Sequence, residues 1–423
     1  MAAAPTSITL RTYQVGFGDC FLLSFNYGES PAAKKKHVLI DFGSTGAPKK
    51  SKVDLLKIAE DIRKVSEGKL AAVVATHRHA DHISGFGGKP GEIIAGLDPD
   101  VVLQPWTEDP EASPTARRPT AQLRAFASFR VALDDMHGIA AYALRESRSV
   151  RGSATLKAQL AFLGEENLKN LPAVRTLMDM KGKHVYAYYG RRSGLESVLP
   201  GVKVRVLGPP TLEQSEAIEK QRAKDPAEFW HFQALAVNRG VGLPPALFKR
   251  AARARASALP FETRWFLPRL DGMRGEQLLE LVRILDKAMN NTSLILLFEV
   301  GGKTLLFPGD AQIENWLYAL RGAPDSAKVC ERLSQVDVYK VGHHGSLNAT
   351  PKTLWGLFKK KGNPGRRDRL ESVVSTMAGK HGSEDRSTEV PRATLMAALE
   401  ENSDLFTTQR LTTDICKVST LQL

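Results

Sequence analysis

Residues 77–82, His-Arg-His-Ala-Asp-His, bring three imidazoles and one carboxylate into a single short segment. Imidazole nitrogen and carboxylate oxygen are ligands that suit zinc, manganese or iron. No cysteine lies within the segment, and a site without thiolates is more typical of a catalytic metal than of a structural one. The chain has only 10 histidines in 423 residues, so this clustering is not expected by chance. The segment therefore predicts the metal centre of a hydrolase.

A short apolar segment must position these side chains. Residues 70–75, Leu-Ala-Ala-Val-Val-Ala, predict a buried strand that ends just before His77. The glycine-rich residues 83–88 follow the cluster, and glycine lets backbone pass close to a metal or a substrate. We therefore expect the ligands at the C-terminal edge of a strand.

Two later segments repeat this layout. Residues 293–300 and 303–307 are apolar and flank Gly301-Gly302, which predicts a hairpin with a two-residue turn leading to Asp310. Residues 336–341 alternate as a half-buried strand and end at His343 and His344. Three strands that each end in His or Asp are expected to bring these groups together at one edge of a sheet.

Several motifs in the same order resemble one known family. The matching segments are 15–19 (Val-Gly-Phe-Gly-Asp), 39–43 (Leu-Ile-Asp-Phe-Gly), 77–82, 291–294 (Asn-Thr-Ser-Leu), 308–310 (Pro-Gly-Asp) and 340–346 (Lys-Val-Gly-His-His-Gly-Ser). The chain resembles the metallo-β-lactamase fold, and within it the hydrolase-like domain of ComEC and its free-standing soluble relatives. The resemblance implies an α/β protein of the αββα sandwich type, with two packed mixed β-sheets flanked by helices.

The resemblance also implies a division of the chain. Its core would comprise residues 1–104, core strands in residues 184–209, and residues 289–423. Residues 105–183 and 210–288 have helical periodicity and are predicted to be two helical insertions.

The same resemblance implies a centre with two divalent ions, zinc or manganese. Asp310 would bridge the ions, Asp81 and His344 would be the catalytic residues, and Asp41 would orient a ligand imidazole through a hydrogen bond. We favour His343 as ligand because it follows the strand directly, and His344 as hydrogen-bond or proton donor, although these two roles could be exchanged. The metal ligands implied are His77, His79, Asp81, His82, Asp310 and His343.

One position departs from the wider fold family. Many of its hydrolases have another His just before the strand that leads to the bridging Asp, whereas this chain has Asn290-Asn291. The ion held by His77 and His79 would then have fewer strong ligands, which favours manganese or weak binding. ComEC-like relatives share the Asn.

Composition sets the remaining expectations. No apolar run approaches the length of a membrane span, and residues 1–7 lack the features of a secretory signal. The three cysteines, Cys20, Cys330 and Cys416, are widely spaced and odd in number, which favours a reducing compartment. We expect a soluble cytoplasmic protein with no membrane partner.

The sequence leaves the substrate open, because this fold hosts many hydrolytic reactions. The net charge of +13 favours a phosphodiesterase or nuclease that acts on nucleic acid or another phosphodiester through a metal-bound hydroxide. One alternative is a hydrolase of small carboxylic esters, thioesters or lactones. A non-catalytic, metal-bound interaction module is a third reading, which the complete ligand motifs disfavour.

Overall fold

The computed structural model describes most of the chain outside its middle segments. The described residues are 4–28, 34–46, 54–109, 170–211, 214–215, 289–346, 350–380 and 389–423. The chain divides into two units, and the first comprises Met1–Glu111, Asn170–Ser215 and Met289–Leu423. The second unit, Ala112–Lys169 and Glu216–Ala288, lies outside the described residues. The following description concerns the first unit.

The described strands form two mixed sheets. The seven-stranded sheet has the order β13-β1-β2-β3-β4-β5-β6, in which β13, β1, β2 and β3 are antiparallel neighbours and β3 to β6 are parallel. Its strands are β1 (Ser7–Tyr13), β2 (Cys20–Asn26), β3 (Lys35–Phe42), β4 (Ala72–Val74), β5 (Val101–Pro105), β6 (Lys183–Ala187) and β13 (Cys416–Gln422).

The second sheet has six described strands in the order β12-β11-β10-β9-β8-β7. Strands β7, β8 and β9 are antiparallel neighbours, and β9 to β12 are parallel. The strands are β7 (Lys203–Gly208), β8 (Ile295–Val300), β9 (Lys303–Phe307), β10 (Val338–Lys340), β11 (Glu371–Val374) and β12 (Asp404–Thr407).

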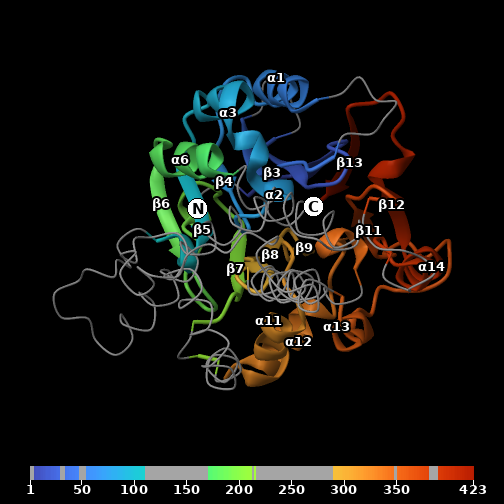
Figure 1. Cartoon of the computed structure of the whole chain (residues 1–423). Helices are drawn as coiled ribbons and strands as arrows, with labels where there is room; N and C mark the ends of the chain where they lie inside the picture. The colour runs from blue at the N-terminus through green and yellow to red at the C-terminus, as the bar shows by residue number, and fades with distance from the viewer. Residues whose placement is uncertain are drawn as a thin grey trace, which may run out of the picture. The chain divides into compact units, whose positions relative to one another are not determined.

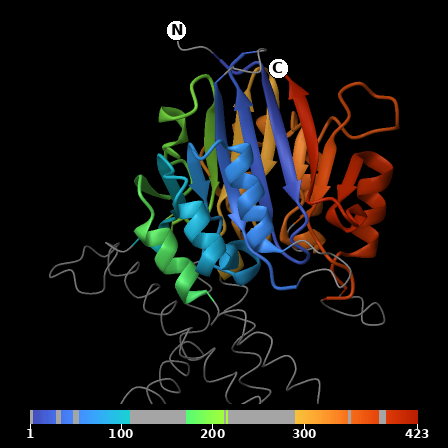
Figure 2. The ribbon, with the colours of Figure 1, turned by 90° about the horizontal axis from the view of Figure 1, so that it is seen from above.

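Helices cover the outer face of each sheet (Figure 1). The first sheet is covered by α1 (Leu55–Val65), α3 (Gly88–Ala95) and α6 (Leu171–Asp179), which share one apolar cluster with β1 to β5. Figure 2 shows α1 and α3 lying along this sheet. The second sheet packs against α11 (Ile313–Leu317), α12 (Ser326–Leu333), α13 (Lys352–Leu357) and α14 (Ala393–Asn402).

The main hydrophobic core lies between the two sheets. The Phe21 ring of β2 packs against Phe307 of β9 with ring centroids 5.7 Å apart, and Phe25 lies 6.3 Å from Phe298 of β8. These rings are buried, and large aromatic side chains contribute much of the burial energy of such an interface. The predicted α/β class, with two packed mixed sheets flanked by helices, is confirmed.

The strands that were predicted to deliver ligands are present. Residues 70–75 contain β4, residues 293–307 contain the β8–β9 hairpin, and residues 336–341 contain β10. At the hairpin turn Gly301 and Gly302 both have positive φ, 54° and 78°, as a two-residue turn of this twist requires.

The predicted insertions lie mostly outside the described residues. Within the range 105–183, however, α6 is described, and its Ala173 and Leu177 pack on the first sheet as part of the first unit. No helix in the described part of the chain combines the length and apolarity that crossing a lipid bilayer requires.

Candidate metal centre

The first half of the site is held by a short helix, α2 (Ala80–Ile83), that follows β4. Its backbone lies directly against the end of β3. A Cβ atom on Gly43 would fall 2.5 Å from atoms of Ala80, Asp81 and His82. Only glycine fits there, so the backbone contact fixes where the Asp81 and His82 side chains begin.

The second half of the site comes from the ends of β9 and β10. Asp310 follows β9, and its carboxylate accepts a hydrogen bond from the backbone N–H of His343 at 3.0 Å. His343 and His344 open a 3₁₀ turn (His343–Gly345) after β10, and both have positive φ, 43° and 53°. Such backbone is strained for residues other than glycine, and strain of this kind is concentrated at functional sites.

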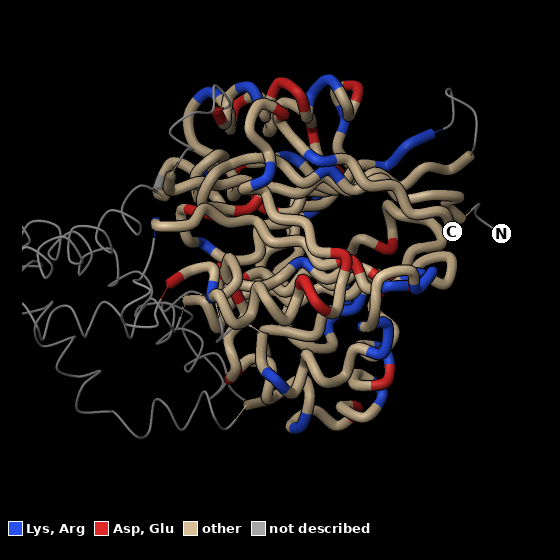
Figure 3. The backbone as a smooth tube through the Cα atoms, turned by 90° about the vertical axis from the view of Figure 1, so that its right-hand side faces the viewer, with Lys and Arg blue, Asp and Glu red and all other residues tan. Residues whose placement is uncertain are grey.

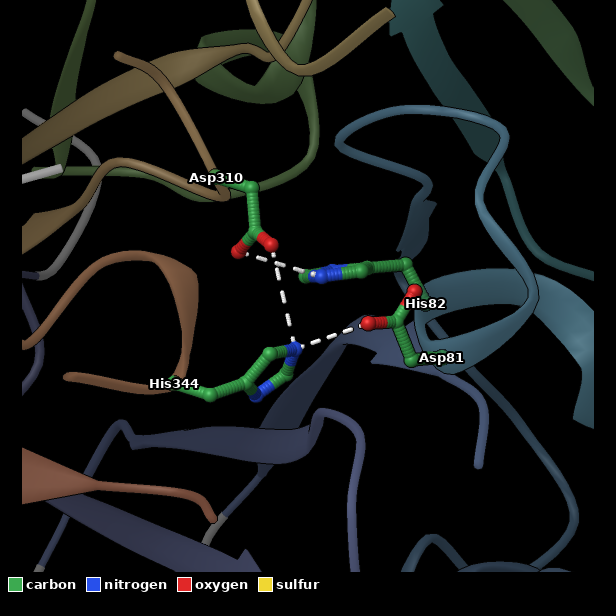
Figure 4. Close-up of side chains that lie close together, drawn as sticks. All are labelled: Asp81, His82, Asp310 and His344. Atoms are coloured by element: carbon green, nitrogen blue, oxygen red, sulfur yellow. Dashed lines mark hydrogen bonds and ion pairs between the residues drawn. The ribbon is translucent and has the colours of Figure 1, made fainter. Parts of the chain in front are cut away.

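Four side chains converge where the two halves meet: Asp81, His82, Asp310 and His344 (Figure 4). Their donor atoms lie within 4.8 Å of one another. His82 Nε2 is 3.1 Å from Asp310 Oδ1, and His344 Nε2 is 2.9 Å from Asp81 Oδ2 and 3.7 Å from Asp310 Oδ2. Two imidazoles and two carboxylates with this spacing form a donor set that fits zinc or manganese.

Hydrogen bonds on the far side of both imidazoles direct their Nε2 atoms toward the cluster. Asp41 Oδ2 lies 2.7 Å from His82 Nδ1, and the carbonyl of Ser375 lies 2.9 Å from His344 Nδ1. An acceptor beside Nδ1 keeps a proton on that atom, so each ring would bind an ion through Nε2 once the ion displaces the second proton. This arrangement is typical of metal-ligating histidine. The predicted role of Asp41 in orienting an imidazole has a structural basis in this contact.

The cluster is rich in buried negative charge. Asp19, Asp41, Asp81 and Asp310 are all buried. Burial opposes ionisation of Asp81, but the charge of His82 and the hydrogen bond from His344 outweigh it and hold the pKa of Asp81 well below its usual value. The pKa of Asp310 is also lowered well below its usual range, because His82, His344 and His343 together outweigh its burial. Asp81 and Asp310 therefore stay ionised and favour a cation between them.

His77 and His79 lie beside this group. Among the described residues, neither belongs to the four-residue cluster, although the His77 ring centroid is 4.2 Å from that of His82. Burial, with His82 and His79 nearby, lowers the pKa of His77 well below its usual value, so this ring is neutral, as a metal ligand must be. His77 Nε2 and His79 Nδ1 are 3.0 Å apart.

The structure distinguishes the two asparagines that stand in place of an expected histidine. Asn290 is buried, and its Oδ1 lies 3.0 Å from His79 Nδ1. Asn291 instead donates a hydrogen bond to Glu314 at 3.0 Å. Asn290 is therefore the residue that faces the histidine segment.

His343 and His344 differ in a way that the sequence could not settle. The His343 side chain is 28% exposed, and its Nε2 is 3.8 Å from Asp310 Oδ2, whereas His344 is fully buried within the cluster. This geometry favours the exchange of the two predicted roles, with His344 as ligand and His343 at the accessible rim. Both residues lie in the left-handed turn after β10, and the ring of the second one, His344, belongs to the cluster.

Two residues of the site were not assigned from the sequence. Asp19 and Lys340 belong to the matching segments 15–19 and 340–346, but the sequence assigns a role to neither. Both side chains are buried and form an ion pair with each other. The signal that could have found Lys340 is a lysine within an otherwise apolar strand that ends directly before the His-His pair.

A comparison of the chain with protein-family models and with curated proteins gives no match. What the structure itself shows is a group of buried histidines and aspartates close enough to bind a metal ion.

Proposed function

We propose that this protein is a metal-dependent hydrolase of the metallo-β-lactamase type and that its substrate is a phosphodiester. The observation that carries the proposal is the buried cluster of Asp81, His82, Asp310 and His344, which joins the ends of strands from both sheets. The motif order in the sequence supports the same family.

The ion would be held by the Nε2 atoms of His82 and His344 and by the carboxylates of Asp81 and Asp310. A bound divalent ion lowers the pKa of water toward neutrality and polarises the scissile group. Asp41 and the Ser375 carbonyl fix the two imidazoles by their hydrogen bonds. His343 is the partly exposed imidazole next to Asp310, and in this proposal it donates a proton to the leaving group.

The support for a phosphodiester is the basic character of the chain. Its net charge is +13, and a positive field attracts phosphate-bearing ligands. Figure 3 shows Lys and Arg interspersed with Asp and Glu along the described backbone. The proposal for the substrate class therefore rests on the charge of the whole chain and requires a direct test.

The test combines metal analysis with hydrolysis of bis-p-nitrophenyl phosphate, DNA and RNA in the presence of manganese or zinc. The wild-type protein is expected to bind the metal and to cleave at least one of these substrates. Asp81→Ala and Asp310→Ala should lose bound metal and activity together. Asp368→Ala is the matched control, because Asp368 pairs with Arg366 on the exposed surface.

A second pair of variants separates the two neighbouring histidines. His344→Ala is expected to lose the metal, whereas His343→Ala should keep it and lose turnover. The opposite pattern would restore His343 as the ligand. If the wild-type protein binds metal but leaves every phosphodiester intact, hydrolysis of carboxylic esters or thioesters becomes the better proposal. If it binds no divalent metal, the site assignment is wrong.

A further inference from the structure

A buried lysine lies beside the cluster of candidate metal ligands. Lys340 is the last residue of β10, and its side chain is only 2% exposed. Its Nζ forms an ion pair with Asp19, donates a hydrogen bond to the Gly309 carbonyl at 3.2 Å and lies 3.6 Å from Asp310 Oδ1. Burial of an ammonium group is costly unless it is paired, so this position needs an explanation.

Asp19 lies between Lys340 and the Nδ1 atoms of two candidate ligands, His82 and His344. Its carboxylate oxygens lie 3.6 Å from His82 Nδ1 and 3.7 Å from His344 Nδ1. The backbone around it is fixed, because the Asp19 N–H donates to the Asp81 carbonyl at 2.8 Å and the Gly43 N–H donates to the Asp19 carbonyl at 3.0 Å. The point from which the Asp19 side chain extends is therefore fixed relative to helix α2 and the end of β3.

Asp19, Asp41 and His82 form a second group of donors within 4.8 Å of one another. These are metal-binding residue types, and they are buried. The His82 Nδ1 atom, however, is already bonded to Asp41 at 2.7 Å, and the Lys340 ammonium is paired with Asp19. The inner group thus already contains a cation that belongs to the protein.

We propose that Lys340 is a fixed internal cation that occupies the inner group and, together with Asp19, sets the affinity of the neighbouring four-residue cluster for a divalent ion. This inference rests on the proposed metal-binding function. Lys340 and Asp19 act here as positioning and charge-setting residues, because neither is among the four donors of the cluster.

Electrostatics gives the two residues opposite effects. Lys340 lies close to Asp310, so its charge repels an ion bound there, whereas the charge of Asp19 attracts it. At the effective dielectric constant of protein sites, one charge a few ångströms away changes the affinity for an ion by about tenfold or more. Removal of one charge alone should therefore change the metal affinity strongly. When both charges are removed, the two opposite effects on affinity should nearly cancel.

The experiment is a double-mutant cycle on the full chain with Lys340→Met, Asp19→Asn and the double variant. Manganese and zinc affinities are measured by competition with a chromophoric chelator, and thermal unfolding is followed with and without the ion. Lys340→Met is expected to bind metal at least about tenfold more tightly, and Asp19→Asn at least about tenfold more weakly. The double variant should return to within about threefold of wild type.

Lys360→Met is the matched control. It removes the same side chain from another largely buried ion pair, in which Lys360 Nζ lies 2.7 Å from Asp337 at the opposite end of β10. Its metal affinity should equal that of the wild-type protein. This control separates a change at the metal site from a general loss of stability.

The variants also distinguish a loss of metal affinity caused by unfolding from a change of affinity caused by charge. If Lys340→Met unfolds without metal because Asp19 is left unpaired, the Asp19→Asn and double variants still test the sign of the effect. Equal affinities across the cycle in folded proteins would overturn the inference and leave metal binding intact. Weaker binding by both Lys340→Met and the double variant would show that Lys340 only supports packing, which also overturns it. If the wild-type protein binds no divalent ion, the proposed function and this inference fail together.

Discussion

At the scale of single residues, Asp41 has the most demanding position in the site. Its φ is 55°, and its two oxygens accept hydrogen bonds from the Thr76 N–H and Thr76 hydroxyl, both at 2.7 Å, and from His82. All three partners are donors, so this side chain must be an acceptor on both oxygens. An asparagine cannot satisfy them, because one of its two polar groups is a donor.

Asp41→Asn should therefore weaken metal binding without unfolding the chain. Loss of a hydrogen bond that orients a ligand imidazole typically lowers metal affinity by about 10- to 100-fold. Chelator competition measures the affinity, and circular dichroism checks the fold. Asp368→Asn, an identical change at an exposed ion pair, should leave affinity unaltered. A wild-type affinity in Asp41→Asn would show that His82 is not a ligand held in this way.

His37 predicts a separate effect of pH on stability. Burial, together with Arg11 and Lys35, lowers the pKa of His37 to about 4, whereas an unfolded chain has a histidine pKa of about 6.5. As pH falls below 6.5, the unfolded state takes up the proton first. The contribution of the neutral His37 to stability is thus complete above pH 6.5 and is lost between pH 6.5 and pH 4.

Replacement of His37 by Gln should remove about 2 kcal/mol of the stability change between pH 7 and pH 4.5. The measurement is denaturant unfolding of both proteins at pH 7 and pH 4.5 in the presence of chelator. The Ser24 hydroxyl, 2.8 Å from His37 Nδ1, remains available to hydrogen-bond the glutamine. An unchanged difference between the two pH values would mean that His37 titrates normally in the folded chain.

At the scale of elements, the site depends on the contact between the end of β3 and helix α2. Gly43→Ala would insert a methyl group into the backbone of α2. Overpacking of this kind costs about 1–3 kcal/mol, and here the displaced residues include Asp81 and His82. We expect lower thermal stability and a loss of metal affinity that exceeds the loss of stability.

The matched substitution is Gly356→Ala in α13. A Cβ atom at Gly356 meets nothing within 4 Å, and alanine is the better helix former by about 1 kcal/mol. That variant should be as stable as wild type or slightly more stable, with unchanged metal binding. Similar behaviour of the two variants would contradict the close packing of β3 against α2.

The sequence predicted elements better than it predicted contacts. Strands β4, β8, β9 and β10 were identified because apolar residues end abruptly at His, Asp or Gly, and the Gly301-Gly302 turn is specified locally. The choice between His343 and His344 depends on which of the two rings enters the cluster, and no residue type at those positions indicates this. The pairing of Asp19 with Lys340 joins β10 to the turn before β2, which is far away in the sequence. No local sequence pattern indicates such a contact.

At the scale of the whole molecule, the candidate ligands connect the two sheets. Asp81 and His344 are 263 residues apart in sequence. An ion that binds all four donors therefore binds the folded state and not the unfolded chain. Ligands of this kind stabilise by mass action, by ~2.7 kcal/mol at a free concentration 100 times the dissociation constant.

Addition of manganese or zinc should raise the unfolding temperature, and a chelator should reverse the change. Asp310→Ala is expected to unfold at the same temperature with and without the ion. Calorimetry on the two proteins measures both effects. A shift of equal size in Asp310→Ala would place the stabilising ion elsewhere in the molecule.

The pairing of β1 with β13 has a consequence for biosynthesis. The backbone N–H of Leu423 donates to Thr6 at 3.1 Å, and Ser7 pairs with Gln422, so one of the first strands to leave the ribosome waits for the last of the described strands. Until β13 emerges, β1 has an edge without a neighbour, and such edges template association between chains. The time needed to translate the segment between β1 and β13 therefore determines how long this edge stays open on a nascent chain.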